Sequence, residues 1–77
     1  MLFLIGYARN EGQLVTFETF KEDESHLAEI ARLELELDLN RQGVEREVVL
    51  LEAENEEALR RTHRRYFENL SELVSAS

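Results

Sequence analysis

The residues best suited to chemistry form one run, Arg60-Arg61-Thr62-His63-Arg64-Arg65-Tyr66. Four arginines are candidates for an anion site: Arg60, Arg61, Arg64 and Arg65. Planar guanidinium groups suit phosphate or carboxylate because they bind either in bidentate geometry. The alternative is a solvated helix face on which the arginines neutralise acids. Glu56, Glu57 and Glu68 stand at the spacing of helical ion pairs, so we favour this alternative.

The two histidines do not indicate catalysis or metal binding. His63 has a ring that titrates near neutral pH, but no neighbouring carboxylate, nucleophile motif or Gly-rich loop accompanies it in the sequence. We expect it to pack within the apolar stripe of a helix, and His26 to lie on the surface. Their spacing matches neither HxxxH nor HExxH, and the chain has no Cys. The sequence therefore predicts no enzyme, no cofactor and no metal.

Composition excludes several partners. The chain has 17 acidic and 9 basic residues and a net charge of −8. This charge disfavours nucleic acid and anionic membranes as partners. There is no Cys for a disulfide, no run of the roughly 20 apolar residues that a membrane span needs, and no basic segment typical of a signal peptide. We expect a cytoplasmic protein with a single domain over residues 1–77.

The first half of the chain predicts a β-hairpin followed by a helix. Residues 2–8 and 14–20 are rich in β-branched and aromatic residues, which is typical of strands. Arg9-Asn10-Glu11-Gly12 between them has the chemistry of a three-residue hairpin loop, with Gly12 in the left-handed conformation. Asp23 or Ser25 is suited to cap the helix that follows.

The second half predicts one more strand and one more helix. Gly43 is placed to end the preceding helix. The run Val48-Val49-Leu50-Leu51 suits a strand with two buried faces. Asn55 can then cap a last helix that runs to about Val74. Connection rules place the third strand beside the first, so we expect a small two-layer α+β sandwich, β-β-α-β-α, with an antiparallel sheet in order 2-1-3. It resembles part of a ferredoxin-like sandwich in architecture only.

Residues 33–39 allow two interpretations. Leu33-Glu34-Leu35-Glu36-Leu37-Asp38-Leu39 alternates strictly between apolar and acidic residues, as a strand does. This would give β-β-α-β-β-α, with residues 40–43 as a hairpin loop. However, Leu and Glu are strong helix formers, and none of the seven residues is β-branched or aromatic. We favour a helix.

A helix over this region has two apolar faces. A projection at 100° per residue places one group on the first face: Leu27, Ala28, Ala31, Leu35 and Leu39. Ile30, Leu33 and Leu37 form the second face. The strands are also apolar on both sides, so either the two helices lie on opposite faces of the sheet or a partner covers one face.

A chain of this size buries only about 60% of its unfolded surface, so self-association is a natural source of stability. We expect a homodimer with a structural or regulatory role. Its interface is predicted to contain Leu2, Leu4, Ile30, Leu33, Leu37, Val48 and Leu50. One alternative is an anion-binding or small-ligand-binding subunit that uses the arginines of the last helix. The other is an acidic inhibitor or antitoxin-like partner of a basic protein, because the acids concentrate in residues 21–59.

Overall fold

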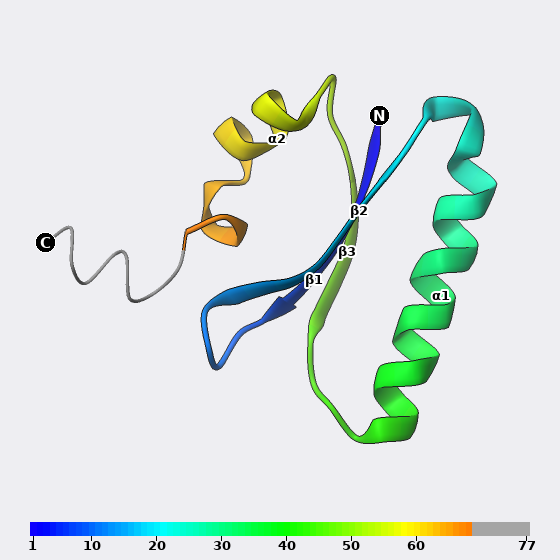
Figure 1. The fold of residues 1–77 in the computed structure, drawn as a ribbon, viewed down its shortest axis with the longest axis vertical. Coiled ribbons are helices and arrows are strands. Elements are labelled where there is room, and N and C mark those ends of the chain that lie inside the picture. The colour runs from blue at the N-terminus through cyan, green and yellow to red at the C-terminus, as the bar shows by residue number, and fades with distance from the viewer. Residues whose placement is uncertain (69–77) are drawn as a thin grey trace, which may run out of the picture.

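The fold is a three-stranded antiparallel sheet with helices on both of its faces (Figure 1). The computed structural model describes residues 1–68. In chain order the elements are β1 (Leu2–Ala8), β2 (Gln13–Phe20), the 3-10 turn η1 (Glu22–Glu24), α1 (Ser25–Gln42), β3 (Glu47–Glu52), α2 (Glu56–Thr62) and the 3-10 turn η2 (Arg64–Tyr66). The predicted α+β class and the strand order 2-1-3 are confirmed.

β1 is the central strand and pairs antiparallel with both neighbours. β2 and β3 are consequently parallel to each other and separated by β1. The hairpin pairing ends at Ala8 and Gln13, so its loop comprises residues 9–12 and is longer than predicted. Gly12 has the predicted positive φ, 61°. The register shifts between Gly6 and Tyr7, which leaves Val15 on β2 as the unpaired residue of a bulge.

Residues 33–39 are helical, so the helix interpretation is confirmed and the extra strand is not formed. α1 ends as predicted at Gly43, which has φ 67° and donates its amide to the carbonyl of Asn40 at 3.2 Å. The amide of Val44 donates to the carbonyl of Leu39 at 3.0 Å, which completes the cap. The start of α1 differs from the prediction, because a 3-10 turn precedes it and neither Asp23 nor Ser25 forms the side-chain cap.

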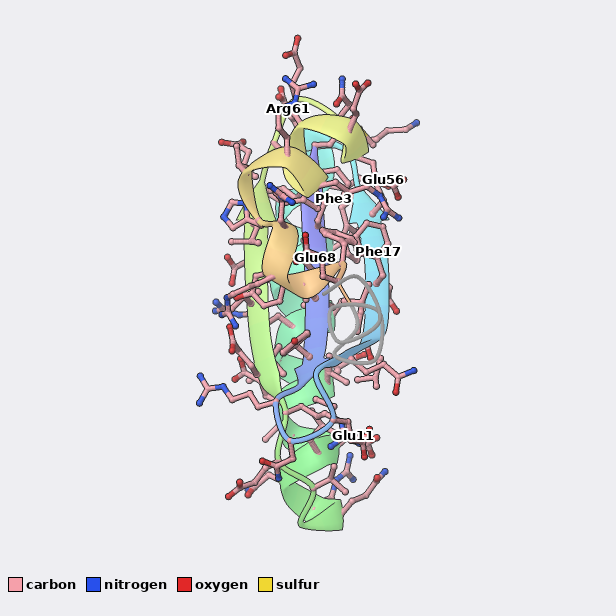
Figure 2. The ribbon with its side chains drawn as sticks, turned by 90° about the vertical axis from the view of Figure 1, so that its left-hand side faces the viewer. Phe3, Glu11, Phe17, Glu56, Arg61 and Glu68 are labelled. Atoms are coloured by element: carbon pink, nitrogen blue, oxygen red, sulfur yellow. The ribbon has the colours of Figure 1, made fainter. Side chains whose placement is uncertain are left out.

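α1 and α2 lie on opposite faces of the sheet, which is the first of the two ways of covering it (Figure 1). The sheet and α1 form the two predicted layers, and α2 with η2 adds a further layer on the other face of the sheet. On that face five buried side chains form the main core: Phe3, Ile5, Tyr7, Leu59 and Tyr66. Figure 2 shows Phe3 and Phe17 side by side beneath α2, with ring centroids 5.7 Å apart.

The α1 face of the sheet is packed by smaller side chains. Leu4 and Ala28 are buried there. A methyl group added at Gly6 would lie 3.0 Å from the Cβ of Thr16 and 3.7 Å from a methyl group of Leu35. This close approach leaves no room for a side chain at Gly6, and it lets α1 lie near the backbone of β1.

The last helix is much shorter than predicted. α2 ends at Thr62, and His63 leaves helical geometry with φ −125° and ψ 51°. A separate 3-10 turn, η2, then brings Tyr66 under the sheet. The remainder of the predicted helix, including Leu70, Leu73 and Val74, lies outside the described residues.

The cap of α1 gives a direct test of its geometry. Gly43→Ala should lower the free energy of unfolding by about 1 kcal/mol, because an alanine is strained at φ 67°. A methyl group at this position would meet no atom within 4 Å, so the cost is conformational rather than steric crowding by neighbours. Urea denaturation measures it. Gly43→Asn is the matched control and should cost less, since asparagine tolerates the left-handed region. Equal stability of all three proteins would contradict this cap.

Candidate interaction surface

The side of α1 that faces away from the sheet carries an apolar seam, which we define as Ile30, Leu33 and Leu37. These side chains are 40%, 56% and 52% exposed. Figure 1 shows α1 as an outer layer, with no other part of residues 1–68 beyond it. The spacing of three and then four residues is that of the seam of a coiled coil. The second apolar face that the sequence predicted is thus exposed to solvent in the single chain.

Leu27 belongs to the predicted first apolar face of α1, but unlike the buried Ala28 of that face it is 53% exposed. It precedes the buried Ala28 by one residue, which corresponds to a rotation of about 100° around the helix. This rotation carries Leu27 to the flank of α1 rather than onto the sheet. Leu27 therefore adds apolar surface beside the first turn of the seam.

The polar residues on either side of the seam are largely paired within α1. Arg32 bonds to Glu29 at 2.9 Å and lies 3.9 Å from Glu36. Arg41 lies 3.7 Å from Asp38 on the other flank. These partly exposed pairs add little stability. They do reduce the net charge next to the seam, which lowers the electrostatic cost of bringing another surface against it.

The sheet residues of the predicted interface are arranged differently from those of α1. Leu2, Leu4, Val48 and Leu50 lie on the face of the sheet that α1 covers. Leu4 is only 1% exposed, and the other three are half-buried. α1 of the same chain therefore performs the covering role assigned to a partner, and the surface open to a second molecule is narrower than predicted.

The predicted anion-site arginines are paired with acids. Arg60 lies 3.4 Å from Glu56, and Arg61 lies 3.3 Å from Glu57. Figure 2 shows Arg61 at the end of the molecule, pointing away from the sheet. Arg64 bonds to Glu68 at 3.2 Å. These three pairs are the ones that helical spacing suggested.

For Arg65 the sequence suggested either Glu68 or the acids of a partner subunit, but within residues 1–68 it pairs with Glu47. This contact belongs to a cluster that the sequence did not predict. Arg65, Arg9 and the hydroxyl group of Tyr66 all donate to the carboxylate of Glu47 at the start of β3. Arg9 is in the hairpin loop, and its Nε donates to Glu47 Oε1 at 2.9 Å. The side chain of Glu47 is only 10% exposed. The Glu47 cluster thus joins the hairpin, β3 and η2.

The contacts of Glu47 alter its titration. The hydrogen bond from Tyr66, with those from Arg9 and Arg65, lowers the pKa of Glu47 from 4.5 to about 2, although burial opposes this. Burial and the Glu47 carboxylate raise the pKa of Tyr66. The carboxylate also raises the pKa of Arg65. Both carboxylate oxygens of Glu47 accept hydrogen bonds within the cluster, which therefore connects the hairpin loop, β3 and η2.

The histidines agree with their predicted structural roles in part. His63 is half-buried, and its Nδ1 lies 2.9 Å from the hydroxyl oxygen of Thr62. Its ring stacks on that of Tyr66, with ring centroids 6.4 Å apart. It ends α2 instead of lying within a longer helix. His26 is exposed. Residues 1–68 contain no group of three or more His, Cys, Asp or Glu side chains placed to hold a metal ion.

Comparison with known proteins gives no information on the function of this chain. No family model, curated protein or solved structure matches this chain. Within residues 1–68, no helix combines the length and apolar character needed to cross a membrane. The exposed seam of α1 is consequently the strongest candidate for a functional surface.

The Glu47 cluster predicts a specific effect of Tyr66→Phe. The variant loses the hydrogen bond from the Tyr66 hydroxyl group to Glu47, which should lower the free energy of unfolding by about 2 kcal/mol near neutral pH. It should also raise the pKa of Glu47, because Tyr66 makes the largest contribution to lowering it. Folding lowers this pKa, so the stabilisation is full above pH 4.5 and is lost as the pH falls toward 2. NMR titration of the Glu47 carboxyl and urea denaturation across this range measure both effects.

Tyr7→Phe is the matched control, because Tyr7 is also buried in this core, and among residues 1–68 its hydroxyl group makes no hydrogen bond. It should leave the pKa of Glu47 near 2 and change stability little. If Tyr66→Phe behaved like Tyr7→Phe, the Tyr66 hydroxyl group would not be a significant partner of Glu47.

Proposed function

We propose that this chain is a non-enzymatic protein-interaction module that associates with a second copy of itself through the seam of α1. The observation that carries this proposal is the exposure of Ile30, Leu33 and Leu37, aligned on the side of α1 opposite the sheet. Scattered exposed leucines are ordinary on protein surfaces, but a continuous stripe at coiled-coil spacing is typical of a contact surface. The role that follows is structural or regulatory.

The energetic argument concerns burial. Full burial of a leucine or isoleucine side chain contributes about 1.5–3 kcal/mol. These residues are 40–56% exposed in the single chain, so pairing two seams would bury about half of each of six side chains and gain about half of that energy per side chain. Part of the gain offsets the entropy of association. The sheet already covers the other side of α1, and α2 covers the opposite face of the sheet. The seam is suited to pair with the seam of a second copy, because a two-fold axis would bring apolar side chains of similar size together.

The acids of α1 do not prevent this contact. Arg32 compensates Glu29 and Glu36, and Arg41 compensates Asp38, within the same helix. Glu34 also flanks the seam, and within residues 1–68 it forms no ion pair. Repulsion between two such charges is modest at a solvated rim and is largely screened at separations beyond about 8 Å at physiological ionic strength. Burial of the seam is the larger effect.

Substitutions in the seam test the proposal. Leu33→Glu or Leu37→Glu should weaken association by about tenfold or more, because each copy then places a charge in an apolar contact. Helix stability should change little, since leucine and glutamate have similar helix propensities. Sedimentation velocity over a range of micromolar concentrations measures the change. Circular dichroism checks that the variants remain folded.

Two controls define the outcome. Val15→Glu makes the same type of change at a valine on β2 that is 46% exposed, and it should leave association unchanged. Glu36→Lys lies beside the seam and should also have little effect. A wild-type chain that stayed monomeric and folded would refute the proposal, as would equal weakening by Leu33→Glu and Val15→Glu.

A further inference from the structure

β3 is an edge strand whose outer backbone groups lack partners within the described chain. The strand order leaves β3 paired only with β1 (Figure 2). The backbone of Met1 and Ala53 exchanges hydrogen bonds at 2.9 and 3.0 Å, which fixes the alternation along β3. From Ala53, every second residue bonds to β1, namely Leu51, Val49 and Glu47. Val48, Leu50 and Glu52 therefore direct their backbone amides and carbonyls outward.

The outer edge of β3 has few of the features that protect edge strands. Natural edges are usually interrupted by a bulge, a proline or a central charge. β2, the opposite edge, has both a bulge at Val15 and a charge at Glu18. β3 has neither between its ends, because its centre is the uncharged run Val48-Val49-Leu50-Leu51. Of the two edges, β3 is the one suited to receive another strand.

We propose that the outer edge of β3 pairs antiparallel with β3 of a second copy, which would join two sheets into one. Pairing about a two-fold axis perpendicular to the sheet places the same face of both sheets on the same side. Residues opposite each other must then share a face. With Val49 on the axis, Val48 lies opposite Leu50 of the second copy, and both belong to the outward-bonding set. Each such pair exchanges two backbone hydrogen bonds.

Charge selects this register over its neighbours. With Val49 on the axis, Arg46 lies opposite Glu52 of the second copy, and the two-fold axis creates this pair twice. Within residues 1–68, neither Arg46 nor Glu52 forms a salt bridge. With Leu50 on the axis, Glu52 would face Val48 and Arg46 would face Glu54, which lies in the bend after the end of β3. With Val48 on the axis, Glu52 would face Val44 and Arg46 would face Leu50. Opposite charges that face each other across strands stabilise the pairing, so the charges favour Val49 as the centre.

This edge is separate from the seam of α1. The seam faces away from the sheet, whereas the edge of β3 lies in the plane of the sheet (Figure 1). Both surfaces could be used at once, because a partner strand at β3 would leave the outer side of α1 uncovered. A chain with two different self-complementary surfaces can assemble beyond a dimer.

Amide hydrogen exchange tests the pairing in the intact chain. At concentrations where sedimentation shows association, the amides of Val48, Leu50 and Glu52 should exchange at least about 100-fold more slowly than those of an unpaired edge. Phe17 and Thr19 provide the matched control, since they alternate with the β2 residues that bond to β1 and so point outward at the other edge. Equally fast exchange at both edges would overturn the proposal, whatever the Leu33 variant does.

A charge exchange tests the register. Arg46→Glu alone or Glu52→Arg alone should weaken association by about tenfold, because each places like charges opposite each other twice. The double variant should restore association to near the wild-type value. The two residues stand at opposite ends of β3 and cannot pair within one copy, so restoration identifies a contact between copies. Single variants without effect, or a double variant no better than the singles, would overturn this register.

Discussion

The structure depends on β1, a strand that is apolar on both faces and must be covered on both. Phe3, Ile5 and Tyr7 point to one face, while Leu4 points to the other. Strands on each side satisfy its backbone groups, but side chains on both faces also have to be removed from water. A single helical layer cannot do this. The chain therefore places α1 on one face, and α2 with η2 on the other.

Covering β1 in this way determines what remains exposed. The described chain is thin, with principal extents of 41 × 33 × 11 Å, so every element except the central strand β1 has a side near solvent. α1 packs one side against the sheet near Gly6 and Leu4, and no other part of residues 1–68 lies beyond it. Its second apolar side is consequently left at the surface. Within residues 1–68 the sheet has three strands, and no further strand pairs with the outer edge of β2 or β3.

Local physical chemistry made most of the fold predictable. Helix propensity decided correctly between the two interpretations of residues 33–39, even though their alternation is that of a strand. Gly43 and Asn55 marked a helix end and a helix start, because caps depend on neighbouring residues only; the Asn55 side chain accepts the Ala58 amide at 2.8 Å. A projection of α1 was sufficient to find the exposed seam, since the direction of a side chain follows from its position in a helix.

The features that sequence analysis missed depend on contacts between distant residues. Glu47 meets Arg9 and Tyr66, which are 38 and 19 residues away, and no spacing rule reaches so far. The early end of α2 also depends on contacts between distant residues. A straight helix through His63 has good local propensity, but the break at His63 allows Tyr66 to contact both Tyr7 and Glu47. Tertiary contacts therefore override the local preference there.

Net charge and apolar surface act in opposite directions on association. A charge of −8 on 77 residues opposes random contact between copies, because any non-specific approach brings acids together. Specific contact is possible only where acids are paired or absent. The seam of α1 meets this condition through Arg32 and Arg41, and β3 meets it through an uncharged centre. In the assemblies that we propose, the acidic surface thereby limits association to a small number of geometries, and each of these requires apolar side chains to meet in register.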